Sequence, residues 1–184
     1  MLHTYFEGVI RNLEKLKDID SSKISLLVDE ITSSKNKKSK IFVYGIGRSG
    51  YVAKAFTMRL MHLGFNVYFV GEPNSPSMED GDILIIISGS GNTYSVVNML
   101  KRVKELKNSG NDFKIISIGC SRNSEVERLS DIYIHIKTHN EEYFPMGTLF
   151  EELAFIFLDG IIYLLMKRLG ITEEEMKKRH CNLL

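Results

Sequence analysis

Two short segments rich in glycine and serine contain the residues best suited to bind an anion. One runs from Gly45 to Gly50 (Gly-Ile-Gly-Arg-Ser-Gly) and the other from Ser88 to Thr93 (Ser-Gly-Ser-Gly-Asn-Thr). Glycine lets the backbone approach a ligand closely, free N–H groups at a helix start attract negative charge, and hydroxyls add neutral donors. We therefore expect the two loops to bind a small phosphorylated molecule, through Gly47, Arg48, Ser49, Ser88, Gly89, Ser90, Gly91, Asn92 and Thr93.

The first loop alone also fits a different ligand. Gly45, Gly47 and Gly50 match the Gly-x-Gly-x-x-Gly fingerprint of dinucleotide-binding proteins, and Glu72 follows about 20 residues later, where such proteins place a ribose-binding acid. An NAD-dependent oxidoreductase is therefore one alternative, and a pair of structural turns with serine caps is another. A dinucleotide site does not need a second hydroxyl-rich loop, so the pair favours a small phosphorylated ligand.

Short apolar runs separated by helical stretches predict the elements that position these loops. The run Ile83–Ile87 is apolar on both faces, which is typical of a central parallel strand. Alternating strands and helices predict an α/β fold, a flavodoxin-like five-stranded parallel sheet that is doubly wound with helices on both faces. In that strand order the two loops flank the point where the winding reverses, and ligands bind there. The expected strands are Ile41–Tyr44, Val67–Val70, Ile83–Ile87, Ile115–Ile118 and Ile132–Ile136, with helices near 49–63 and 93–107.

Extra helices are expected at both ends of the chain. Tyr5, Val9, Leu13 and Leu16 share one helical face, and Ser21 or Ser22 can cap a second helix. A long helix over about 147–168 is apolar almost all round, so we expect part of it to pack against another subunit. A capping box at Thr172–Glu175 starts a short final helix.

Composition narrows the class of protein. A chain of 184 residues is expected to form one domain, 1–184. Its 24 basic and 23 acidic residues lack the basic excess of a nucleic-acid binder. No apolar run reaches the length of a membrane span and no signal peptide is recognisable, so we expect no membrane partner and a cytoplasmic location. Cys120 and Cys181 are expected to be reduced thiols, and the histidine spacing predicts no metal site.

The two loops resemble those of the SIS (sugar isomerase) family of phosphosugar domains. Further segments narrow the resemblance to the 6-phospho-3-hexuloisomerases over nearly the whole chain; they are Gly47–Tyr51, Met58–Gly64, Pro145–Thr148 with Phe150-Glu151, and Arg179–Leu183. The resemblance implies a homotetramer, no metal or organic cofactor, and a phosphorylated ketohexose as substrate. The implied reaction interconverts 3-hexulose 6-phosphate and fructose 6-phosphate.

That reaction needs a positioned base and a group that stabilises an enediolate oxygen. The resemblance assigns the base to Glu151, which follows the aromatic residue of the family pattern. Glu151 is also expected in the first turn of an apolar helix, where partial desolvation strengthens a base while the helix dipole favours the carboxylate. The alternative is that Glu151 only complements the helix start. Glu152 is a weaker candidate, since it lies about 100° around the helix and cannot face the same sugar.

Two histidines and one arginine complete the candidate site. The resemblance makes His180 a general acid or a hydrogen-bond donor to the enediol, with a solvated tail residue as the alternative. His62 is expected to be packed in the protein or to bridge subunits. Arg48 is expected to hold a phosphate or a sugar hydroxyl, or else to pair with an acid on a neighbouring loop.

A non-catalytic phosphosugar sensor is the remaining alternative, because the family includes regulatory modules. It is disfavoured because no DNA-binding segment is fused to the domain and because Glu151 stands where a base is needed.

Overall fold

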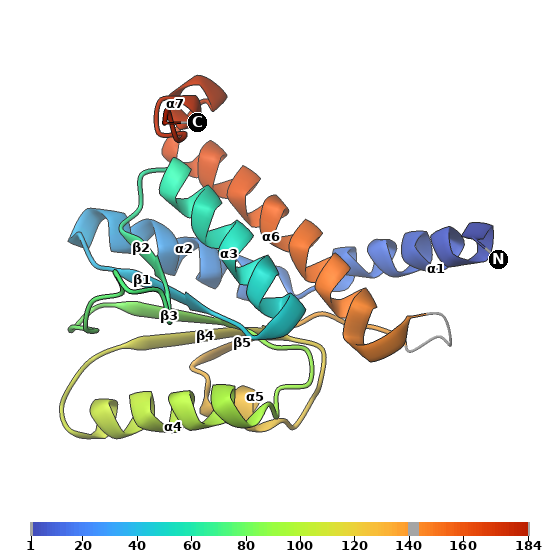
Figure 1. Ribbon diagram of the computed structural model, residues 1–184, viewed down its shortest axis with the longest axis horizontal. Helices are drawn as coiled ribbons and strands as arrows, with labels where there is room; N and C mark the ends of the chain where they lie inside the picture. The colour runs from blue at the N-terminus through green and yellow to red at the C-terminus, as the bar shows by residue number, and fades with distance from the viewer. Residues whose placement is uncertain (1, 140–143, 184) are drawn as a thin grey trace.

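A twisted sheet of five parallel strands forms the centre of the molecule in the computed structural model, which describes residues 2–139 and 144–183 (Figure 1). The strand order β2-β1-β3-β4-β5 is flavodoxin-like, so the predicted fold class is confirmed. The predicted strand ends are correct to within one residue. The strands are β1 (Ile41–Tyr44), β2 (Val67–Phe69), β3 (Ile83–Ile87), β4 (Lys114–Gly119) and β5 (Ile132–His135).

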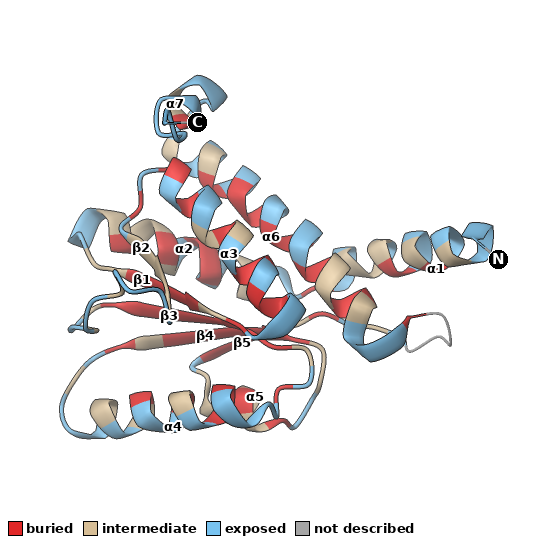
Figure 2. Ribbon diagram, viewed as in Figure 1, coloured by how far each residue is buried: buried red, intermediate tan, exposed pale blue. Residues whose placement is uncertain are grey.

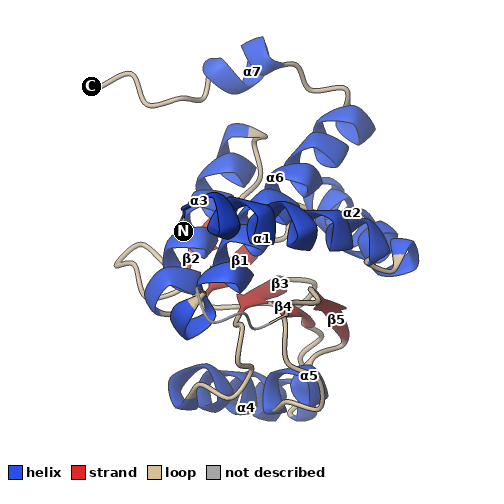
Figure 3. Cartoon of the chain, turned by 90° about the vertical axis from the view of Figure 1, so that its right-hand side faces the viewer, coloured by secondary structure: helices blue, strands red, loops and turns tan. Residues whose placement is uncertain are grey.

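Helices cover both faces of the sheet, as Figure 3 shows in a view turned by 90°. The helices α2 (Ser21–Lys37), α3 (Gly47–His62) and α6 (Thr148–Leu169) lie on one face, and α4 (Tyr94–Asn108) and α5 (Glu125–Leu129) on the other. The central strand β3 supplies both layers: Ile83, Ile85 and Ile87 pack in the larger core, whereas Leu84 and Ile86 pack under α4. Burial of alternate side chains on opposite faces explains why its sequence is apolar throughout.

The N-terminal segment forms α1 (Leu2–Glu14), the short 3-10 helix η1 (Lys15–Asp18) and then α2. Asp20 caps α2, since its carboxylate accepts a hydrogen bond of 2.8 Å from the Ser22 N–H; the predicted serine cap is therefore wrong by one or two residues. Helix α1 projects from the body of the molecule, and its Leu2, Phe6 and Ile10 are exposed (Figure 2).

The C-terminal third comprises the 3-10 turn η2 (Pro145–Gly147), the long helix α6 and the short helix α7 (Glu173–Lys177), which starts with the predicted capping box. One side of α6 lies in the core. Its other side leaves Phe155, Ile156, Tyr163 and Leu164 at least partly exposed. No helix in the described part of the chain is long and apolar enough to cross a membrane.

Candidate active site

The two glycine-serine loops meet at the carboxyl edge of the sheet, because β1 and β3 are hydrogen-bonded neighbours. Between them lies a pocket of about 370 Å³. Its wall includes the start of α6 as well as both loops. It is lined by Ile46, Ser49, Ile87, Ser88, Gly89, Ser90, Thr93, Val96, Cys120, Met146, Gly147, Phe150 and Glu151.

The first loop turns directly into α3. Gly47, the first helical residue, has a φ of +60°, a conformation that favours glycine. Gly45 is tightly packed, since a Cβ there would lie 2.7 Å from the Ser49 carbonyl oxygen and 3.0 Å from that of Ile87. The loop therefore holds Ser49, which is buried, against the pocket. Gly47 and Arg48 do not line this pocket, and Arg48 lines the outer hollow beside it.

In the second loop, Ser88, Gly89, Ser90 and Thr93 line the pocket. The hydroxyls of Ser90 and Thr93 lie 3.3 Å apart, so both converge on the same space. Gly91 takes a φ of +62° and packs on Ser124, where no side chain would fit. The Asn92 side chain faces away from the pocket: its Oδ1 accepts a hydrogen bond of 3.0 Å from the Glu125 N–H and ties the loop to α5.

Glu151 lies in the first turn of α6, at the edge of the pocket. Its side chain is only 12% exposed and pairs with Arg48, which is 61% exposed. Arg48 was expected to bind either substrate or an acid, and the structure shows the ion pair. The pair joins the first loop to α6 and keeps the carboxylate between the pocket and a second, outer hollow that Tyr51, Val52 and Phe155 help to line.

Glu152 points away from the pocket, as its helical position predicts. Its Oε1 accepts a hydrogen bond of 2.6 Å from the Tyr5 hydroxyl of α1. Its Oε2 is buried and has no hydrogen-bond partner among the described residues. The two adjacent glutamates both line the outer hollow, but only Glu151 also lines the pocket between the loops, and Glu152 anchors α1.

His180 lies near His62 and far from Glu151. The two imidazole rings stack with centroids 5.3 Å apart, and Arg179 donates a hydrogen bond of 3.3 Å to the His62 carbonyl oxygen. His62 ends α3, whereas Arg48 lies at its start, and a helix of 16 residues spans roughly 22 Å between its first and last residues. One chain therefore does not bring its own His180 and Glu151 to the same sugar.

Seven residues that line the pocket were not predicted as part of the site, and three of them, Cys120, Met146 and Phe150, place large or reactive side chains there. Cys120 follows β4 at the same edge of the sheet, and burial raises the pKa of its thiol. Met146 has a φ of 56° and is almost fully exposed at the mouth of the pocket. Phe150 is 2% exposed and forms part of the wall. The position of Cys120 directly after a strand was the one sequence signal that could have identified it.

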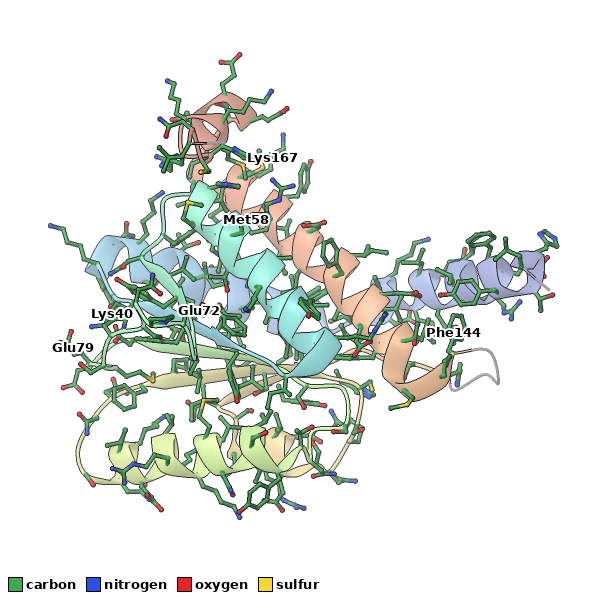
Figure 4. All side chains as sticks on the ribbon, viewed as in Figure 1. Lys40, Met58, Glu72, Glu79, Phe144 and Lys167 are labelled. Atoms are coloured by element: carbon green, nitrogen blue, oxygen red, sulfur yellow. The ribbon has the colours of Figure 1, made fainter. Side chains whose placement is uncertain are left out.

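The geometry gives little support to the dinucleotide alternative. Glu72 pairs with Lys54 at 2.7 Å and is not among the residues that line the pocket. Figure 4 shows it well away from Phe144, which comes just before η2 and α6. Within residues 2–139 and 144–183, no group of three His, Cys, Asp or Glu side chains is placed to hold a metal ion.

Comparison with known proteins agrees with this architecture. Residues 35–156 match the SIS domain family. The 3-hexulose-6-phosphate isomerase of Methanocaldococcus jannaschii is 49% identical over 163 residues, which cover 89% of this chain and 85% of the relative. The 3-hexulose-6-phosphate isomerase of Bacillus subtilis is 36% identical over 173 residues, which cover 90% of this chain and 89% of the relative. A Methanococcus jannaschii crystal structure, from which a molecular function of 3-hexulose-6-phosphate isomerase was inferred, has a TM-score of 0.86 at 45% identity and covers 98% of this chain and 99% of that one. The chain therefore belongs to the SIS domain family.

Proposed function

We propose that this chain is a 3-hexulose-6-phosphate isomerase that interconverts 3-hexulose 6-phosphate and fructose 6-phosphate. The observation that carries the proposal is a partly buried carboxylate, Glu151, at the edge of a pocket formed by two anion-binding loops. The Methanocaldococcus jannaschii relative named as a 3-hexulose-6-phosphate isomerase is 49% identical over 89% of this chain, which supports the same substrate class. The proposal also holds that residues 1–184 form one domain.

The reaction moves one proton between two carbon atoms. A base removes the proton from C2 of 3-hexulose 6-phosphate, and the electrons of that C–H bond form the C2=C3 double bond of an enediolate. The hydroxyl proton of O2 then moves to the O3 oxyanion, and a proton returned to C3 gives the C2 ketone and the C3 hydroxyl of fructose 6-phosphate. The site must therefore hold the sugar still, accept a proton and stabilise negative charge on oxygen.

The structure offers a group for each of these tasks. The backbone and hydroxyls of Ser88, Ser90 and Thr93, with Ser49 from the first loop, would bind the phosphate. Glu151 would act as the base, because its side chain lies at the edge of the pocket between the loops and is held there by its ion pair with Arg48. Arg48, largely exposed, would also be free to contact the sugar hydroxyls or phosphate when substrate enters.

We include a second chain in the proposal. The exposed apolar side chains of α1, α3 and α6 would be covered in a homo-oligomer, for which the family resemblance implies a tetramer. His180 would then act as the acid in the site of a neighbouring chain, with His62 packed against it. The proposed chemistry needs no metal or organic cofactor.

Isotope exchange tests the proposed reaction. Fructose 6-phosphate incubated with the protein in deuterated water should gain deuterium at C3, because the proton removed in the reverse direction exchanges with solvent before it returns. Nuclear magnetic resonance detects the label, and formation of fructose 6-phosphate from 3-hexulose 6-phosphate gives the forward rate. Binding of fructose 6-phosphate with neither exchange nor turnover would instead indicate a sensor.

A further inference from the structure

The first turn of α6 contacts both anion-binding loops through two adjacent residues. Glu151 forms its ion pair with Arg48 of the first loop, while the Phe150 ring packs on Gly89 of the second. Phe150 is 2% exposed, so its ring is enclosed between the loop and the core. The position of the carboxylate relative to the second loop thus depends on the contact that its neighbour makes.

The contact between Phe150 and Gly89 leaves no spare room. A Cβ on Gly89 would lie 2.8 Å from Cδ1 of the Phe150 ring, closer than such atoms approach in folded proteins, and 3.2 Å from Cγ, which is a tight contact. Those ring atoms are the nearest neighbours of that position. Gly89 is therefore needed at this position for the approach of Phe150.

Gly89 is also held from β4. Its carbonyl oxygen accepts a hydrogen bond from the Cys120 N–H at 3.3 Å and another from the Cys120 thiol at 3.2 Å. Because β4 is a central strand of the sheet, this side of the loop cannot yield easily. The loop is thus held between the end of β4 on one side and the aromatic ring of α6 on the other.

We infer that Phe150 is a positioning residue that sets the distance between the second anion-binding loop and Glu151. The inference rests on the proposed function, in which the loop holds the phosphate and Glu151 removes a proton several atoms away along the same sugar. A substrate fixed at its phosphate presents C2 at one place, so a shift of the carboxylate by about 1 Å costs up to 100-fold in rate while binding is retained.

A double-mutant cycle with Gly89→Ala and Phe150→Leu tests the contact. Gly89→Ala adds a methyl group against the ring and should lower kcat about 100-fold, and Phe150→Leu loosens the contact and should lower kcat about tenfold. The pair should be more active than Gly89→Ala alone, because the smaller side chain makes room for the methyl group. KM for 3-hexulose 6-phosphate should change less than kcat in Phe150→Leu. A double variant no more active than Gly89→Ala would overturn the inference.

Phe157→Leu is the matched control, since Phe157 is a buried phenylalanine two turns further along α6 that does not line the pocket. It should lower the melting temperature about as much as Phe150→Leu and leave kcat unchanged. If Gly89→Ala fails to fold, Phe150→Leu decides alone: kcat within twofold of the wild type refutes the positioning role, and a tenfold fall with little change in KM supports it.

Failure of the proposed function would be recognised separately, as absence of turnover in the wild-type protein. In that case, crystal structures of the variants measure the distance between the second anion-binding loop and the first turn of α6. Gly89→Ala should move the first turn of α6 away from the loop. In the double variant, Phe150→Leu should restore the wild-type position of that turn. An unmoved first turn in Gly89→Ala would refute the inference without reference to activity.

Discussion

The helices α3 and α6 run side by side, and their two ends differ in chemistry. At their N-terminal ends, Arg48 and Glu151 form an ion pair beside an open pocket. At their C-terminal ends, His62 is 3% exposed and stacks on His180 beside Met166 and Met176. In Figure 4, Met58 of α3 and Lys167 of α6 lie toward this second end, on the side of the molecule that carries α7.

The difference shows which groups one chain can bring together by itself. Groups at the carboxyl edge of a parallel sheet converge because adjacent strands end side by side. His180 is positioned in another way, by Arg179, which donates hydrogen bonds to the carbonyl oxygens of His62 and Glu175. Any joint action of Glu151 and His180 on one sugar therefore requires two chains, and the predictions below test each end and then the link between them.

The largest effect is expected at Glu151. Glu151→Gln keeps the size of the side chain but removes the base, so kcat should fall about 1,000-fold, within the range measured for loss of a general base. Binding of fructose 6-phosphate, measured by calorimetry, should remain near the wild-type value because the loops are unchanged. Near-normal turnover would refute the assignment.

Glu152→Gln is the control for that experiment. Glu152 is the adjacent residue on the same helix, but it accepts a hydrogen bond from Tyr5 and does not line the pocket between the loops. A glutamine can still accept that hydrogen bond, so turnover should change little. Equal losses in the two variants would show that the first turn of α6, rather than one carboxylate, had been damaged.

The next effect concerns the link between the two ends. His180→Asn, or deletion of residues 179–184, should lower kcat about 100-fold with a smaller effect on stability, as expected for loss of a general acid. If His180 acts in a neighbouring chain, oligomers formed from equal amounts of His180→Asn and Glu151→Gln chains should recover about a quarter of wild-type activity, since each site has a half chance of receiving each intact residue. A mixture no more active than its components would contradict action across chains.

A smaller effect is expected at Arg48. Arg48→Ala removes a charged donor at the rim of the pocket, and KM should rise about tenfold if the guanidinium contacts substrate. Arg102→Ala, which breaks an exposed pair with Glu105 on α4, is the control and should leave KM unchanged. Reduced kcat with unchanged KM in Arg48→Ala would mean that Arg48 serves only to hold Glu151.

Much of the fold could be predicted because its signals are local. The isoleucine-rich run of β3 is apolar at every position, as a strand covered on both faces requires, and its bounds were predicted correctly. Helix α5 was missed because its five residues are too few to show a helical period. The cap of α2 was misplaced because Asp20, Ser21 and Ser22 are all good capping residues and only the backbone geometry distinguishes them.

The site was predictable only where the topology fixes it. Ser49, Ser88 and Glu151 converge on one pocket, as parallel strand ends and the adjoining helix start allow. The direction of the Asn92 side chain could not be predicted, because it depends on a hydrogen bond to α5, a helix distant in sequence. The same holds for Phe150, whose contact with Gly89 joins residues about 60 positions apart and has no sequence period to reveal it.

The smallest predicted effect is a dependence of stability on pH at the C-terminal end of α3. Burial lowers the pKa of His62 below its usual 6.5, and the nearby His180 and Arg59 lower it further. The folded protein therefore binds a proton at His62 less readily than the unfolded chain does, so the stability that neutral His62 contributes is present above about pH 6.5 and is lost as the pH falls.

Between pH 7.5 and 5.0, the melting temperature of wild-type protein should therefore fall by about 3 °C more than that of His62→Gln, which cannot titrate. Differential scanning calorimetry at several pH values gives the slope of melting temperature against pH for each protein. Comparing the two slopes removes any constant loss of stability that the substitution itself causes. His3→Gln is the control, since the His3 side chain is 87% exposed on α1, and it should keep the wild-type slope. Equal slopes of melting temperature against pH for wild type and His62→Gln would show that protonation of His62 does not oppose folding.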